Sequence, residues 1–309
     1  MPTSAQRQVI DPILSNVVQG YKHPEHIGHA LFPRVPVESS GGQVIEFNKN
    51  SFRLYKTARA PGTPFQRIQF GYLGKPYAVE NHGVEAAVPR EHMRDASIVP
   101  GIDLASGAIS GVMSVNSLVM EKQHADIARN AASYDANHKV TLAGTDQWND
   151  YVNSDPVKDI NDAREAIRSS TGVYPNVISI PSAVFDILCE HPKITDKIKY
   201  TQTAIVTEQL LAAALKADKV VVGKAIGFDD ADASIDFWGK DVVLAYVPSV
   251  ISGAQEPSYG YTYTLTGHPN VEVPYWDNST KSWVYGIGYE RVPVLSGITS
   301  GFLIINAIA

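Results

Sequence analysis

The first 40 residues contain so many prolines that they cannot form a domain of their own. The prolines are Pro2, Pro12, Pro24, Pro33 and Pro36. Each fixes one backbone dihedral angle and removes one hydrogen-bond donor. The run HPEHIGHALF, residues 23–32, predicts one short helix, with Pro24 in its first turn. We therefore expect an arm that lies on another surface.

Residues 44–88 predict a long hairpin. Stretches of alternating polar and apolar residues flank the turn-forming run TARAPGTP, residues 57–64. A two-stranded hairpin by itself is only marginally stable in water. A projecting hairpin therefore needs a partner surface.

The hairpin segment carries no acidic residue between Phe47 and Val79, and its basic residues alternate with aromatic ones. Such a surface could bind nucleic acid, because aromatic rings stack on bases and cations follow phosphates. It could equally dock onto protein, because Arg and Tyr are favoured interface anchors. We predict subunit docking through Lys49, Phe52, Arg53, Tyr55, Lys56, Arg59, Phe65, Arg67 and Lys75.

The rest of the chain mixes helices and strands without a regular repeat, which favours an α+β fold over a doubly wound parallel sheet. Apolar residues at helical period predict one long helix from Asp103 to about Tyr134. Asp155, Pro156 and Gly172 are typical of the cap, first turn and exit of a second helix. Further helices are expected at 182–190 and after Thr207. Strands are expected at 176–180, 219–223, 241–248 and throughout 258–309.

The composition is that of a globular protein. The 309 residues are 44% hydrophobic and 19% charged, which suits one large core or two ordinary domains. Residues 1–75 carry nine Lys or Arg against four Asp or Glu, a balance of +5, whereas the whole chain carries −6 and the remainder therefore −11. Opposite net charges in two parts of the chain favour contacts between neighbouring subunits over binding of nucleic acid by the whole protein.

Motifs for catalysis and cofactor binding are missing from the sequence. Gly223 and Lys224 lack the upstream glycine of a phosphate-binding loop, and the run GIGYER, residues 286–291, lacks the third glycine of a dinucleotide site. No nucleophile elbow or zinc-protease motif is found. We predict no catalytic residue, no cofactor and no enzymatic activity.

Three further features invite a chemical interpretation that we do not adopt. His23, His26 and His29 are more typical of solvated side chains on an arm than of a metal site. The acidic run 230–241 resembles a calcium loop but has Ile235 where glycine is needed. Cys189, the one cysteine, is expected to be a buried thiol, in keeping with a reducing cytoplasm.

Neither a membrane span nor a signal peptide is predicted. The longest uncharged stretch, residues 104–120, is diluted by serines and is too short, although Gly107 and Gly111 have the spacing of membrane-helix dimers. The first residues lack a basic start followed by an apolar run.

Taken in order, the segments resemble the tailed-phage major capsid proteins of the Hong Kong 97 type fold, particularly the lambda-like capsid protein E branch. The resemblance spans nearly the whole chain and is specific only when its parts are combined. The runs that carry it are GYKHPEHIGHALFPRVPV, FRLYKTARAPG, TGVYPNVISIPSAVFDILCEHPKITDKIKYT, DFWGKDVVLAYVP and EPSYGYTYTL.

The resemblance implies a division into an arm, an extended loop, a peripheral domain with a long spine helix, and an axial domain. These fall at 1–43, 44–88, 89–150 with 270–309, and 151–269. Some family members carry a long scaffolding segment before the arm, which here begins almost at once. We therefore expect a separate scaffold or the removal of such a segment. No cross-link between a loop lysine and an asparagine is predicted.

The function that the resemblance implies is self-assembly, as hexamers and pentamers, into an icosahedral head that encloses double-stranded DNA. Expected partners are other copies of the chain, a scaffolding protein, a portal and possible decoration proteins, with DNA bound non-specifically. The expected location is the virion, after assembly in the host cytoplasm. Two alternatives stay open, an encapsulin shell that encloses protein cargo and a soluble hydrolase with scattered catalytic residues.

Overall fold

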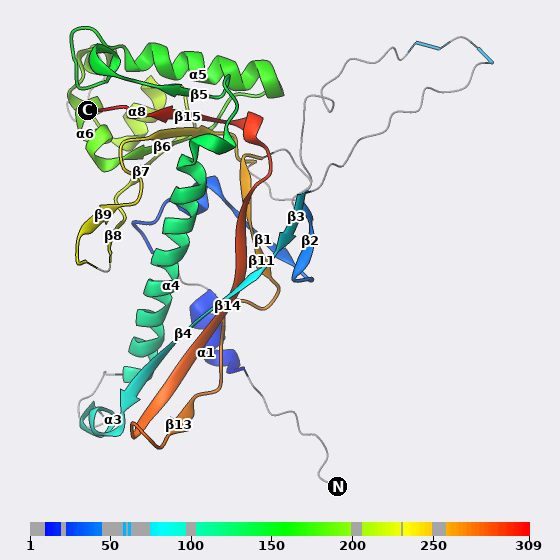
Figure 1. Ribbon diagram of the computed structural model, residues 1–309, viewed down its shortest axis with the longest axis vertical. Coiled ribbons are helices and arrows are strands. Elements are labelled where there is room, and N and C mark those ends of the chain that lie inside the picture. The colour runs from blue at the N-terminus through cyan, green and yellow to red at the C-terminus, as the bar shows by residue number, and fades with distance from the viewer. Residues whose placement is uncertain are drawn as a thin grey trace.

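The computed structural model describes residues 10–19, 23–44, 58–59, 61–62, 75–96, 103–198, 206–229, 231–248 and 258–309. Helices and strands follow one another without a repeating order, so the predicted α+β class is confirmed. The long helix α4, Leu104–Arg129, runs along a six-stranded sheet (Figure 1). A five-stranded sheet lies at the C-terminal end of α4.

Helix α4 begins where the sequence predicts. The Asp103 carboxylate accepts hydrogen bonds from the backbone nitrogens of Ala105 and Ser106, which are otherwise unpaired at a helix start. The helix ends at Arg129, before the predicted limit near Tyr134, because Asn130 adopts an extended conformation and a 3-10 turn follows. No helix among the described residues is long and apolar enough to cross a membrane.

The six-stranded sheet is organised around its longest strand, β14. It pairs antiparallel with β4 over ten residues, from Arg291 opposite Glu80 to Ser282 opposite Pro89. Most of β4 falls within the predicted hairpin, but Val84, Ala86 and Val88 face α4 and so draw the strand into the sheet. The strands are β1 (Arg34–Val37), β4 (Glu80–Pro89), β11 (Gly260–Leu265), β12 (Asn270–Val271), β13 (Tyr275–Asp277) and β14 (Ser282–Leu295).

Both faces of the five-stranded sheet are buried except at its edge strand, Lys139–Thr141, where Val140 is exposed. Ile178, Leu244 and Ile304 face the core formed with helices, whereas Val177 and Val243 face the arm and the end of α4. Burial on two sides explains why these strands read as continuous apolar runs. In spatial order the strands are β5 (Lys139–Thr141), β15 (Gly301–Ile305), β10 (Val242–Ala245), β6 (Val177–Pro181) and β7 (Lys219–Gly223).

The predicted end signals of helix α5, Pro156–Thr171, are confirmed. The Asp155 carboxylate accepts from the backbone nitrogen of Lys158, and Gly172 closes the helix with a φ of 76°. Thr207 likewise caps α8. The remaining helices are α1 (Pro12–Gln19), α2 (Gly28–Leu31), α3 (Arg90–Ala96), α6 (Ser182–Glu190), α7 (Pro192–Ile198) and α8 (Glu208–Ala214).

Two further sheets of the described chain have two strands each. Strand β2, Gly41–Val44, pairs antiparallel with β3, Lys75–Ala78, and brings the two ends of the basic segment side by side. Strand β8, Ile226–Phe228, pairs with β9, Ser234–Asp236.

Helix α2 in the arm is shorter than the sequence predicts. It begins only at Gly28, and Pro24 lies in a turn before it, so the prediction of a helix with Pro24 in its first turn was wrong.

Sheet membership differs from the predicted division of the chain at three strands. β5 and β15 fall in the ranges predicted as peripheral, yet both belong to the five-stranded sheet, where β15 pairs with β10 and β5 pairs with β15. β11 falls in the range predicted as axial, yet it pairs with β14 in the six-stranded sheet. Pairings between strands so distant in sequence leave no local signal.

Candidate functional site: the arm seat and the exposed docking surfaces

The arm, as far as residues 23–37, is built into the core of its own subunit. Leu31 and Phe32 are fully buried. Strand β1 pairs in parallel with β11, from Arg34 opposite Thr262 onward. This part of the arm therefore belongs to the folded subunit.

The Glu121 carboxylate on α4 lies at the centre of the contact between the arm and the rest of the subunit. Its oxygens accept hydrogen bonds of 2.9 Å from the backbone nitrogens of Ile27 and Gly28 and from the indole nitrogen of Trp238. Burial raises the pKa of Glu121, and the three donors oppose that shift. Because its oxygens are supplied with donors, the carboxylate can occupy the interior.

His124 fills the space beneath the arm. Its ring stacks on Phe32 with centroids 5.0 Å apart, and Nε2 lies 2.9 Å from the Thr262 hydroxyl. Burial lowers the pKa of His124 to about 3. A Cβ at Gly28 would lie 2.3 Å from Nδ1 of His124, so the arm can approach this closely only with glycine here.

A second connection ties the end of α4 to the five-stranded sheet. Arg129 donates hydrogen bonds of 2.8 Å to the Asp241 carboxylate and 2.7 Å to the Phe237 carbonyl. Asp241 also accepts from the backbone nitrogen of Asn306 at 3.0 Å. Spine helix and sheet are thus held by charged hydrogen bonds as well as by apolar packing.

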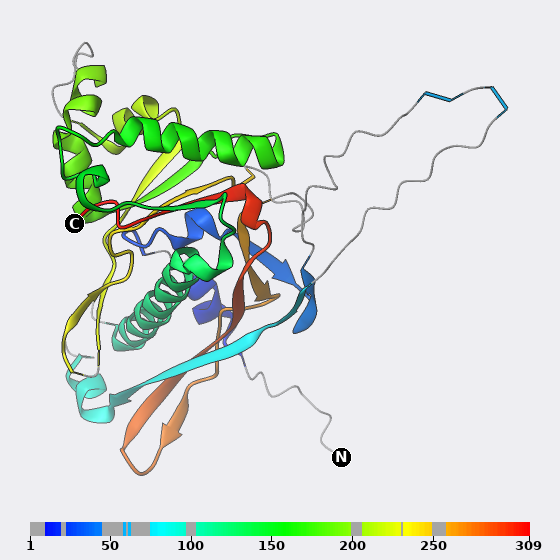
Figure 2. The same cartoon turned by 45° about the horizontal axis from the view of Figure 1, so that its top comes forward.

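The β8–β9 hairpin exposes a concentration of apolar side chains. Ile226, Phe228 and Ile235 are 52%, 70% and 40% exposed. The hairpin extends away from the five-stranded sheet (Figure 2), and it consists of only two strands. Exposed apolar groups on an isolated hairpin are typical of a surface that a partner covers.

A second exposed surface lies at the far end of β14, where it pairs with β13. Tyr275 is 48% exposed, and Trp276 and Trp283 make an edge-to-face contact with ring centroids 5.6 Å apart. Aromatic side chains of this kind are common anchors of protein interfaces.

The predicted docking residues fall mostly outside the described part of the chain. The structure describes Arg59, which is exposed, and the backbone of Lys75 in β3. The assignment to subunit docking stays a prediction for all nine. Those outside the described residues are Lys49, Phe52, Arg53, Tyr55, Lys56, Phe65 and Arg67.

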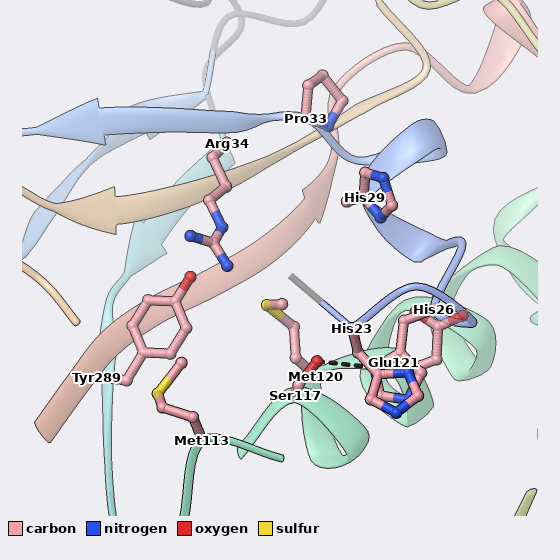
Figure 3. A pocket seen from close by; sticks show the side chains of 10 residues that line it. All are labelled: His23, His26, His29, Pro33, Arg34, Met113, Ser117, Met120, Glu121 and Tyr289. Atoms are coloured by element: carbon pink, nitrogen blue, oxygen red, sulfur yellow. Dashed lines mark hydrogen bonds between the residues drawn. The ribbon is translucent and has the colours of Figure 1, made fainter. Parts of the chain in front are cut away.

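The three arm histidines line a hollow of about 280 Å³ (Figure 3). His26 is only 8% exposed, so the expectation of a solvated side chain was wrong for this residue. Its Nδ1 lies 2.7 Å from the Ser117 hydroxyl, and burial lowers the pKa of His26 to about 4. Within the described ranges, no three His, Cys, Asp or Glu side chains gather in a way that could hold a metal ion.

Sequence reasoning missed Glu121 and Trp238. Glu121 lies in the helical run that also presents Met113, Ser117 and Met120 to the interior. An acidic residue on the apolar face of a long helix could have marked a buried carboxylate. Its donors could not have been found, because they come from segments about a hundred residues away on either side.

The comparisons with known proteins decide the family. The family described as Phage major capsid protein E matches residues 107–279. The major capsid protein of Burkholderia phage BcepMu is 36% identical over 302 residues, which cover 96% of each chain. The chain belongs to the phage major capsid protein E family. It is therefore a major capsid protein, as the resemblance implied, and the family is one of structural virion proteins.

Solved structures agree with the fold predicted for this capsid protein. A phage-related protein from Bordetella bronchiseptica RB50 is 44% identical, covers 98% of both chains and has a TM-score of 0.84. The putative capsid protein of an Escherichia coli CFT073 prophage has a TM-score of 0.55 at 11% identity, over 96% of this chain and 97% of that one. An encapsulin from Synechococcus elongatus PCC 7942 has a TM-score of 0.53 at 10% identity, over 99% of this chain and 91% of that one. At such low identity the encapsulin shares the fold alone, so the phage alternative is the one supported.

Proposed function

We propose that the capsid protein assembles through hexamers and pentamers into an icosahedral head that encloses double-stranded DNA. The observation that supports this most is the pair of exposed apolar surfaces, on β8–β9 and on β13–β14, in a subunit whose core is otherwise well buried. Closed symmetric assembly covers such surfaces in every copy at once. A DNA-filled head is the natural product for a member of a phage capsid family.

The proposed division of the subunit follows the family pattern, and both sheets cross its boundaries. The arm is assigned to 1–43, the extended loop to 44–88, the peripheral domain to 89–150 with 270–309, and the axial domain to 151–269. Judged by sheet pairing, β5 and β15 belong to the axial unit and β11 to the peripheral one. The spine helix α4 connects the two.

The basic segment between Phe47 and Val79 is proposed to dock onto an acidic surface of a neighbouring copy. The segment carries +6, whereas the chain beyond residue 75 carries −11. Each exposed ion pair contributes only about 0 to 1 kcal/mol, but the contact recurs in every subunit of a shell.

Reversing Arg53, Lys56 and Arg59 to Glu tests this docking. The subunit should stay folded, as judged by circular dichroism, and shells should fail to form or form weakly. If the segment instead holds DNA, empty shells should form normally and lose only their DNA. Normal yields of empty shells at both low and high salt would contradict the docking role.

Further partners are proposed from the family: a scaffolding protein, a portal and possible decoration proteins. Binding of DNA is proposed to be weak and independent of its sequence, since the chain is net acidic. Assembly is placed in the host cytoplasm, and no catalytic role is assigned.

Electron microscopy and sedimentation of the purified protein, with any scaffold supplied, test the proposed shell. The purified protein should form closed particles. Particles recovered after infection should enclose DNA that is protected from nuclease. A folded chain that stays monomeric under these conditions would contradict it.

A further inference from the structure

The hollow lined by the arm histidines lies where the arm, the spine helix and β14 meet. Arg34 of β1 and Tyr289 of β14 stand at one end of it, and His23 and Glu121 stand at the other (Figure 3). Its floor is apolar and includes Met113 and Met120. The hollow thus combines hydrocarbon surface with charged groups.

Two guanidinium groups lie near the same aromatic ring at one end of the hollow. The Cζ atoms of Arg34 and Arg291 lie 5.4 Å and 4.6 Å from the centroid of the Tyr289 ring. Among the residues that the structure describes, neither arginine forms an ion pair with a carboxylate. Glu121 also lines the hollow, but its oxygens are already occupied by Ile27, Gly28 and Trp238.

Buried donors close to this end have no acceptor. The Tyr289 hydroxyl and the Nε and Nη1 atoms of Arg291 are buried and find no hydrogen-bond partner in the described part of the chain. Arg291 is fully buried and Tyr289 is 1% exposed. Polar groups buried to this degree nearly always have partners. Figure 3 shows the Tyr289 hydroxyl pointing toward the Arg34 guanidinium, where a shared anion would meet both.

We propose that this hollow receives the carboxylate of an acidic side chain from a neighbouring copy of the chain. The carboxylate binds Arg34 and Tyr289, and its aliphatic stem lies on Met113 and Met120. Arg34 is half-buried and its side chain is long, so its guanidinium group can turn toward the incoming carboxylate. Arg291 adds a fixed positive charge near the Tyr289 ring.

A second copy is the favoured source of the carboxylate because of the charge distribution. The hollow draws its arm residues from the part of the chain that carries +5, and the remainder of every copy carries −11. In the proposed shell every copy contacts other copies, and the remainder of each copy is net acidic. This inference rests on the proposed assembly into a shell.

The test removes the unpartnered hydroxyl and compares subunit stability with assembly. Tyr289→Phe should leave the isolated subunit as stable as the wild type or more stable, since the hydroxyl has no partner there. The same variant should raise the subunit concentration needed for shell formation by about tenfold, because a hydrogen bond to a charged group is lost at every contact.

Ser179→Ala is the matched control, because it also removes a buried hydroxyl without a described partner, but in the five-stranded sheet. It should assemble at the wild-type concentration. Arg34→Met should keep the fold and raise the assembly concentration at least as much as Tyr289→Phe. If Tyr289→Phe and Arg34→Met assemble like the wild type, the inference is wrong.

The affinity of the site for a carboxylate is tested with acetate on the isolated full-length subunit at constant ionic strength. Acetate should raise the melting temperature of the wild type and not that of Arg34→Met, because acetate stands in for the neighbour's side chain. A melting temperature that does not respond, or that rises equally in both proteins, would overturn the site. If the wild type itself does not form shells, the proposed function is wrong. If the wild type forms shells and the two variants form them equally well, only this inference is wrong.

Discussion

The indole nitrogen of Trp238 donates a hydrogen bond of 2.9 Å to Oε1 of Glu121, which joins the segment after β9 to the spine helix. The same carboxylate receives the backbone nitrogens of Ile27 and Gly28 from the arm. One buried side chain therefore connects three segments that are far apart in sequence. Subunit integrity should depend on it more than on any exposed acidic residue.

Glu121→Gln should destabilise the subunit by about 3 kcal/mol, because the amide offers one acceptor oxygen and turns an NH₂ group toward buried donors. Urea unfolding followed by circular dichroism measures the loss. Glu165→Gln on α5 is the control, since Glu165 is about half exposed and its bonds to Arg168 and Tyr174 lie at the surface. The control should lose much less stability, because exposed ion pairs contribute little. Equal losses in both variants would rule out a special role for Glu121.

Two glycine-to-alanine changes should shift stability in opposite directions. Gly28→Ala brings a methyl group to 2.3 Å from His124 and should cost about 2 kcal/mol, through overpacking of a buried site. Gly111→Ala lies within α4, where nothing stands within 4 Å of the added atom, and should stabilise by about 0.5 to 1 kcal/mol. Thermal unfolding of both variants provides the measurement. Stabilisation by Gly28→Ala would show that the arm is not held against His124.

Acid should destabilise the subunit through His124. Its pKa in the folded state is about 3, below the unfolded value of about 6.5. Burial is the main cause, and the charges of Arg291, His29, Arg34 and His26 add to it. The unfolded chain therefore takes up a proton as the pH falls below 6.5, while the folded chain does not. The stability that this histidine contributes is complete above that pH, and about 2 kcal/mol of it is lost by pH 5.

The measurement is the change in unfolding free energy between pH 7 and pH 5 for the wild type and for His124→Gln. The change should be about 2 kcal/mol smaller in the variant. Glu121 acts in the opposite direction, because its pKa is raised and its contribution falls as the pH rises. Since Glu121 is present in both proteins, its contribution cancels in the comparison. An identical pH response in both would refute the assignment to His124.

Phe228→Ser should impair assembly without affecting the subunit. Phe228 is 70% exposed on the β8–β9 hairpin, so its loss removes little packing within the subunit, but it removes apolar area from the proposed interface. Val152→Ser is the control, because Val152 is 86% exposed and lies outside both proposed surfaces. Sedimentation should show fewer shells for Phe228→Ser only. The same yield from both variants would remove the hairpin from the docking surface.

The local structure of this capsid protein was largely predictable from its sequence. Asp155, Pro156 and Gly172 set the limits of α5 because cap and exit contacts join residues only a few positions apart. Apolar runs predicted β6, β7, β10 and β15 of the five-stranded sheet, because their buried positions are apolar. The short edge strand β5, Lys139–Thr141, has no such run and was not predicted. The order of the segments was also enough to predict the family, because the resemblance combined several runs over nearly the whole chain.

What only the tertiary structure decided is which of these elements meet. The pairing of β15 with β5, the withdrawal of β4 into the sheet and the donors of Glu121 all depend on contacts between residues far apart in the chain. His26 shows the same limit, because the proline-rich arm around it suggested a solvated side chain, whereas packing against α4 buries it. The free energy of such contacts depends on residues that only folding brings together. A short stretch of sequence therefore cannot predict them.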